Sequence, residues 1–345
     1  MGAIVADNTQ SVSPNSPGSR VARDQTPVYG QPEEKFLPSI SPAMEPTVHT
    51  SFEKTTGTWQ YIVADPISKK AVIIDSVLDY NPATNSISTA TADELLRLVK
   101  VHGYTVDRIL ETHVHADHLT ASRYLQSKLS SDETTPDICI GAGIAEVHKT
   151  FGPKFGVSQE ELEGAFDHTF QDMETFPLGT LEVKIMHLPG HTPDHVGYMI
   201  GSYVFTGDSI FNPDVGSARC DFPKGSATAL WASTQKLLAL PPHYRLYTGH
   251  DYPPATRESD KEPGRGEARP YATVAEHKAH NKHVKDGTVE EQFVQWRTER
   301  DATLSAPRLL NQALQVNIRA GRLPVGTADG TRFILVPLQV PAGAF

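Results

Sequence analysis

Long apolar runs are missing from this sequence. No stretch approaches the roughly eighteen consecutive apolar residues that a membrane-spanning helix requires, so we expect no such helix. Cysteine is also scarce: Cys139 and Cys220 are the only two in 345 residues. Two cysteines are too few for a disulfide framework. This scarcity favours a reducing compartment, and the cytoplasm is the expected location.

Positive charge is in deficit. The chain has 31 Lys and Arg residues against 41 Asp and Glu residues, a formal net charge of -10. Such a balance disfavours a surface that neutralises nucleic-acid phosphates. We therefore expect a small-molecule substrate and neither a nucleic-acid nor a membrane partner. A homodimer is compatible with the sequence, which does not decide the oligomeric state.

The composition divides the chain near residue 46. Residues 1–46 are rich in Ser and Pro, and they lack both the apolar core of a secretory signal and the Arg-rich character of a transit peptide. We expect a disordered N-terminal tail there. Residues 47–345 are expected to form one catalytic domain, whose helical C-terminal part, from about residue 273, packs against the rest and helps to wall the site.

Strand-like and helix-like stretches alternate after the tail. The first two β-branched runs predict a hairpin, and the next amphipathic stretch predicts a helix that opens at Thr91 and stops at Gly103. The hairpin strands and further predicted strands cover residues 59–65, 71–75, 108–112, 138–141, 181–186, 196–200, 203–206 and 245–247. Further helices are predicted over residues 119–129, 145–149, 227–240, 273–284, 289–300 and 307–318. This order predicts two sheets face to face with helices outside, a four-layer α/β/β/α sandwich.

A dense histidine cluster follows the strand predicted over residues 108–112. It reads His113-x-His115-x-Asp117-His118, four metal-ligand residue types within six positions. Imidazole and carboxylate together suit zinc or ferrous iron, and a loop can turn all four side chains toward one place. A polar surface loop is the alternative, but this density favours a metal site.

Three later segments end predicted strands with similar residues. His191 follows a Pro-Gly turn, Asp208 follows Thr-Gly, and His250 follows another Thr-Gly. Each pair alone is typical of an ordinary turn, whereas the ordered set indicates metal ligands. His195 lies close to His191, and either a supporting or a structural role is open for it.

The complete set resembles the metallo-β-lactamase superfamily, whose signature is His-x-His-x-Asp-His followed by a distant His, Asp and His. The resemblance implies one metal on His113, His115 and His191. It implies a second metal on Asp117, His118 and His250, with Asp208 as the bridge between the two.

Within that superfamily, residues 215–223 are similar to the Gly-x-x-Arg-x-Asp-Phe segment of the persulfide dioxygenases, a branch close to glyoxalase II. The similarity extends through residues 74–82, 111–119, 250–252, 273–277, 300–304 and 315–324. It implies one Fe(2+) per chain on His113, His191 and Asp208, with oxidation of glutathione persulfide to sulfite. Arg219 would position the glutathione moiety or brace its loop, and Tyr252 would lie close to the metal-bound substrate.

A hydrolase remains the alternative, because the residues for two metal ions are all present. Two Zn(2+) per chain would activate a hydroxide for attack on a thioester, lactone or lactam, with Asp117 or a neighbouring water shuttling the proton. Pro193-Asp194-His195 resembles the hydrolytic relatives more than many dioxygenases. A non-catalytic or nucleic-acid-processing role is disfavoured by the intact ligand set and the acidic balance. Cys220 is expected to be an inert packing residue.

Overall fold

The computed structural model describes residues 44–255, 257, 266–338, 340, 341 and 343. The expected disordered tail falls almost entirely on residues 1–43, outside the described residues. The described chain begins at Met44 and enters its first strand at Thr47. Among the helices of the described part, none is long and apolar enough to cross a membrane.

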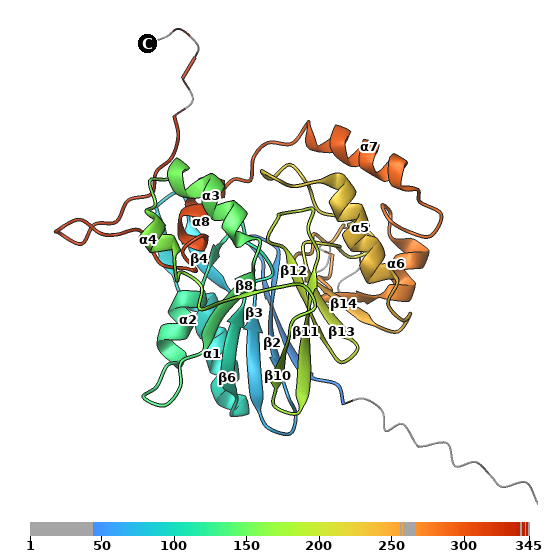
Figure 1. The fold of residues 1–345 in the computed structure, drawn as a ribbon, viewed down its shortest axis with the longest axis horizontal. Coiled ribbons are helices and arrows are strands. Elements are labelled where there is room, and N and C mark those ends of the chain that lie inside the picture. Colours follow the sequence, from blue (N-terminus) through green and yellow to red (C-terminus); the bar gives the residue numbers. More distant parts are fainter. Residues whose placement is uncertain (1–43, 256, 258–265, 339, 342, 344–345) are drawn as a thin grey trace, which may run out of the picture. The chain divides into compact units, whose positions relative to one another are not determined.

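Two six-stranded sheets form the centre of the fold (Figure 1). The first has the order β1-β2-β3-β6-β8-β9, and its last four strands run parallel. These strands are β1 Thr47–Glu53, β2 Thr58–Ala64, β3 Lys70–Ile74, β6 Thr105–Leu110, β8 Asp137–Gly141 and β9 His168–Phe170. The second sheet runs in chain order from β10 to β15. Its strands are β10 Thr175–Leu178, β11 Leu181–His187, β12 Val196–Ile200, β13 Tyr203–Gly207, β14 Arg245–Thr248 and β15 Tyr271–Thr273.

Side-chain alternation along the strands builds the layers. On β2, Tyr61 and Val63 face the core between the sheets, whereas Ile62 and Ala64 face the helices. Helices α1 Ala90–His102, α2 Ser122–Leu129, α3 Ile144–Lys154, α4 Gln159–Leu162 and α8 Leu310–Asn317 contribute to the core over the first sheet. The core over the second sheet receives side chains from three helices, α5 Ala227–Leu238, α6 Val274–His280 and α7 Glu290–Asp301. The fold is therefore the predicted α/β/β/α sandwich, and every residue of β2 is buried because both of its faces are covered.

The start of one predicted helix is wrong. Leu119 and Thr120 form the short strand β7, which pairs with β4 Val77–Asn81, and helix α2 begins only at Ser122. A third small sheet results, completed by β5 Ser86–Ser88. The extended backbone at Thr120 is fixed by a distant partner, since its N–H donates to Asn317 Oδ1 at 2.9 Å.

Parallel pairing brings two of the predicted ligands to one sheet edge. Strands β13 and β14 run parallel, and Asp208 and His250 follow their ends within two residues. Gly207 and Gly249 make this approach possible: a Cβ on Gly207 would lie 2.4 Å from Thr112 Oγ1, and one on Gly249 would lie 2.5 Å from Asp208 Oδ1. The strand-glycine-ligand pattern is thus a packing requirement of the site.

Candidate metal centre

The seven predicted ligands gather into two neighbouring groups of donor atoms. In each group the donors lie within 4.8 Å of one another. The first group contains His113, His191 and Asp208, and the second contains His115, Asp117, His118 and His250. Asp208 lies between the two groups, with Oδ2 at 3.6 Å from His191 Nε2 and Oδ1 at 3.6 Å from His250 Nε2.

His115 departs from the expected grouping with His113 and His191. Its Nε2 lies 3.1 Å from Asp75 Oδ1 and 3.3 Å from Glu111 Oε2, and all three side chains are buried. The two carboxylates hold the ring so that its Nδ1 is the atom left for the centre. The structure therefore places His115 with the second group.

The histidines are oriented by partners on their outer nitrogens. His191 Nδ1 donates to the Arg219 carbonyl at 2.7 Å, and His118 Nδ1 donates to the Leu119 carbonyl at 3.1 Å. His113 Nδ1 donates to Thr112 Oγ1 at 2.9 Å, because the Thr112 hydroxyl itself donates to Asp75. Each bond leaves Nε2 unprotonated and available for a metal.

Several buried inner atoms have no hydrogen-bond partner in the described structure. They are His115 Nδ1, His118 Nε2, Asp117 Oδ2 and Asp208 Oδ1. Burying such atoms without a partner costs free energy, and a coordinated cation satisfies all of them together. Imidazole nitrogens and carboxylate oxygens in this arrangement fit zinc or ferrous iron.

Burial tunes the protonation of the ligands. It lowers the pKa of His113 well below the usual value, with the neighbouring His115 adding to the effect, and it lowers the pKa of His118 to about 4. Burial also opposes ionisation of Asp117, but the rings of His250 and His118 outweigh it and lower that pKa to about 2. His113 and His118 are therefore neutral beside an ionised Asp117, which are the states that bind a metal ion. Burial also opposes the charged forms of His115 and His250, but nearby carboxylates outweigh it and raise the pKa of both rings.

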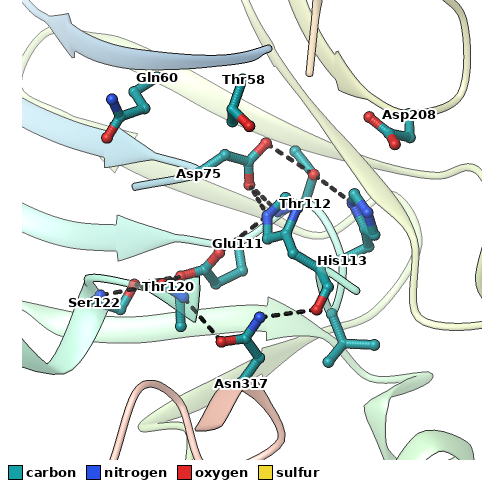
Figure 2. A network of polar contacts seen from close by, with 12 residues as sticks. Thr58, Gln60, Asp75, Glu111, Thr112, His113, Thr120, Ser122, Asp208 and Asn317 are labelled. Atoms are coloured by element: carbon teal, nitrogen blue, oxygen red, sulfur yellow. Dashed lines mark hydrogen bonds and ion pairs between the residues drawn. The ribbon is translucent and has the colours of Figure 1, made fainter. Parts of the chain in front are cut away.

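Two supporting carboxylates were not identified from the sequence. Asp75, directly after β3, accepts bonds from Thr112 N at 2.8 Å and Thr112 Oγ1 at 2.9 Å (Figure 2). It also contacts His115 Nε2. Glu111 accepts the hydroxyl hydrogens of Thr120 and Ser122. Asp75 follows a buried strand, as the predicted ligands do, and that position was the one signal that could have identified it.

Asn317 supports the histidine loop from the far end of the chain. Its Nδ2 donates to the carbonyl oxygens of His115 and His118, both at 2.8 Å. Its Oδ1 accepts from Thr120 N, a bond that Figure 2 shows. The last turn of α8 thus fixes the loop that carries four of the ligands. No local sequence pattern marks this residue.

His195 has a supporting position. The ring is fully buried, its Nε2 accepts the backbone N–H of Asp208 at 2.9 Å, and it stacks on His113 with ring centroids 4.7 Å apart. It orients Asp208, which lies between the two donor groups, and it is not among the residues that line the cavity described next.

A cavity of about 710 Å³ opens onto the centre, with Asp117, His191, Asp208 and His250 among its lining residues. Tyr252 lines it too, 53% exposed, with its ring stacked on His250 at 5.8 Å.

Val215, Ser217, Ala218 and Arg219 line one side of this cavity. The Arg219 guanidinium binds the Asp221 carboxylate and donates to the Ser305 carbonyl at 2.8 Å, so Arg219 braces this side. Burial raises the pKa of the neighbouring Cys220 thiol to about 12, which fits an inert packing residue.

Comparison with known proteins agrees with this geometry. The family model of the metallo-beta-lactamase superfamily matches residues 55–250. Glyoxylase B2 of Dictyostelium discoideum is 43% identical over 290 residues, covering 83% of this chain and 95% of that protein. The mitochondrial persulfide dioxygenase ETHE1 of Homo sapiens is 29% identical over 204 residues, covering 58% of this chain and 66% of that protein. The crystal structure of ETHE1 from Myxococcus xanthus superposes with a TM-score of 0.61 at 26% identity, covering 80% of this chain and all of that one. The match over more than half of the sequence, together with the sandwich and its ligand loops, shows that this chain belongs to the metallo-β-lactamase superfamily.

Proposed function

We propose that the protein is a persulfide dioxygenase that binds one ferrous ion on His113, His191 and Asp208. The observation that carries the proposal is that these three residues form a donor group of their own, two imidazoles and one carboxylate. That set is the ligand triad of non-haem ferrous oxygenases, which leaves one face of the metal open. The position of His115 supports it, because Asp75 and Glu111 hold this ring in the other group.

The proposed reaction converts glutathione persulfide, dioxygen and water into glutathione, sulfite and two protons. When bound, ferrous iron would supply the one-electron chemistry and the shared site that persulfide sulfur and dioxygen need. The chain's own residues prepare that site: His195 orients Asp208, and the Arg219 carbonyl orients His191. Tyr252 lies beside the centre and shields one side of the proposed substrate position.

The charge of the cavity supports an anionic substrate. Lys282, Arg300 and Arg308 line it, are exposed, and form no ion pair with described residues. The whole chain has a net charge of -10, so a cluster of three unpaired cations is unlike the charge of the chain as a whole. Glutathione carries two carboxylates, which such side chains bind well. We assign its recognition to these cations, since Arg219 is already paired.

We expect Arg308→Ala to raise KM for glutathione persulfide about ten-fold, the loss expected for one charge-assisted contact, with a smaller change in kcat. Steady-state oxygen uptake measures both constants. Arg322→Ala is the matched control, because Arg322 is an exposed arginine outside the cavity lining. An unchanged KM in Arg308→Ala would contradict this assignment.

A two-metal hydrolase is the second candidate function. The observation that favours it is the complete second group of His115, Asp117, His118 and His250, with Asp208 placed between the groups. Two zinc ions would then provide a hydroxide for attack on a thioester, lactone or lactam. Asp117, whose pKa is lowered to about 2, would be ionised and able to accept the proton.

Metal analysis of protein purified without added metal, combined with an oxygen-electrode assay, separates the two candidates. We expect about one iron per chain and oxygen uptake that depends on glutathione persulfide. Two zinc ions per chain without oxygen uptake would contradict the dioxygenase proposal. A panel of thioester, lactone and lactam substrates would then test the hydrolase.

A further inference from the structure

A second hollow adjoins the cavity that opens onto the metal centre. Its volume is about 590 Å³, and the β4–β5 hairpin forms one side of it through residues 77–83. Thr55, Thr56 and Arg308 line both the cavity and this second space, which we call the hairpin hollow. The two spaces therefore border each other at these three residues.

The hairpin hollow begins beside the metal centre. His118, a predicted ligand, lines it together with Leu119, whereas Asp117 of the same loop lines the cavity. The loop that carries these ligands thus borders both spaces. A substrate whose sulfur reaches the centre is therefore able to place one end in the cavity and the other end in the hollow.

The two spaces differ in charge. Apart from two predicted metal ligands, no described lining residue of the cavity is acidic, and its cations include Lys282 and Arg300. The hairpin hollow is lined by two carboxylates, those of Glu53 and Asp79, together with the shared Arg308. An ammonium group is therefore repelled by the cavity and attracted by the hollow.

The two carboxylates of the hollow are fixed in place. Glu53 ends β1 and accepts the N–H groups of Thr55 and Thr56, both at 2.7 Å, and the Thr56 hydroxyl at 2.6 Å. Burial would raise the pKa of Glu53, but the bonds from these threonines outweigh it and lower that pKa. Asp79 accepts the N–H and the hydroxyl of Thr91. The β1–β2 turn therefore holds an ionised carboxylate at the border between the two spaces.

We propose that the hairpin hollow is a subsite for the α-amino-acid end of the γ-glutamyl group, with Arg308 binding its α-carboxylate and Glu53 its α-ammonium. This inference rests on the proposed function, in which glutathione persulfide is the substrate. A zwitterionic amino-acid end needs one anion and one cation as partners, and the hollow supplies both. The glycine carboxylate at the opposite end of the substrate then binds Lys282 and Arg300 in the cavity.

Isothermal titration calorimetry of the metal-loaded protein tests the subsite without turnover. The first ligand is S-methylglutathione, whose sulfur is blocked, and the second is glutaryl-S-methylcysteinylglycine, the same molecule without its α-ammonium. We expect the wild type to bind the second ligand about ten-fold more weakly, the loss expected for one charge-assisted contact. Glu53→Gln should bind S-methylglutathione about ten-fold more weakly than the wild type does, and it should bind the two ligands about equally.

The comparison of two ligands in one variant separates recognition from folding, because a general loss of structure weakens both ligands alike. Arg308→Ala should weaken both and keep the difference between them, since both ligands retain the α-carboxylate. Glu160→Gln is the matched control, because Glu160 is exposed on α4 and outside both linings. It should bind both ligands as the wild type does.

The outcomes distinguish the subsite from the reaction. Equal binding of the two ligands by the wild type, or a difference that Glu53→Gln retains, would overturn the subsite and leave the dioxygenase proposal standing. No binding of S-methylglutathione by the wild type would overturn both. The expected binding pattern without oxygen uptake would support the subsite and overturn the oxidation alone.

Discussion

His191→Ala should leave the protein without metal in the first donor group and lower turnover by about a thousand-fold or more under either proposed reaction. The reason is geometric. His191 supplies one of the three donors of the first group, and the Arg219 carbonyl holds its ring in place, so alanine leaves this group with two donors. Metal content by mass spectrometry and turnover by oxygen uptake, or by hydrolysis of the substrate panel, measure the two effects.

His250→Ala distinguishes the one-metal dioxygenase from the two-metal hydrolase. His250 belongs to the second donor group, and its contact with the first is through Asp208 at 3.6 Å. If one iron sits on the triad, the variant should keep about one metal ion per chain. If two metal ions are required, it should lose at least one of two. His243→Ala controls for the substitution, because His243 is exposed and in neither group. Full metal content and activity in His191→Ala would contradict the site assignment.

The sequence was sufficient for the sandwich and for the place where the ligands meet. Strands that end in ligand-type residues predict a common edge, because parallel strands such as β13 and β14 bring their ends together. Gly207 and Gly249, which looked like ordinary turn residues, proved to be required by the close approach of Thr112 and Asp208. Here the local pattern and the tertiary arrangement agree, and the family resemblance was confirmed.

The remaining features depend on contacts between distant segments. Leu119 and Thr120 read as the start of a helix, but pairing with β4 and the bond to Asn317 favour an extended backbone. The cavity cations lie far along the chain from the histidine loop, and only packing brings Lys282, Arg300 and Arg308 to its mouth. His115 could not be assigned to a group without the positions of Asp75 and Glu111. Spacing alone carries none of this information.

Asn317→Ala should weaken metal binding by about ten- to a hundred-fold and lower the free energy of unfolding by about 3 kcal/mol. The amide makes three hydrogen bonds to buried backbone groups: the carbonyl oxygens of His115 and His118, and the N–H of Thr120. Alanine leaves all three groups buried without a partner, so the loop that carries His113 to His118 loses its fixed position. Metal titration of the apo protein and urea unfolding measure the two effects.

Asn311→Ala is the control on the same helix, since no described residue forms a hydrogen bond with the Asn311 side chain. It should change metal affinity by less than about two-fold, because helix α8 keeps its contacts with the loop. If Asn317→Ala lost stability but kept wild-type metal affinity, the residue would hold α8 in place without shaping the centre. Equal losses of metal affinity in the two variants would assign the effect to the helix as a whole. A loss of metal affinity in Asn317→Ala alone requires that the side chain acts through the two loop carbonyls, because those are its bonds to the residues that carry the ligands.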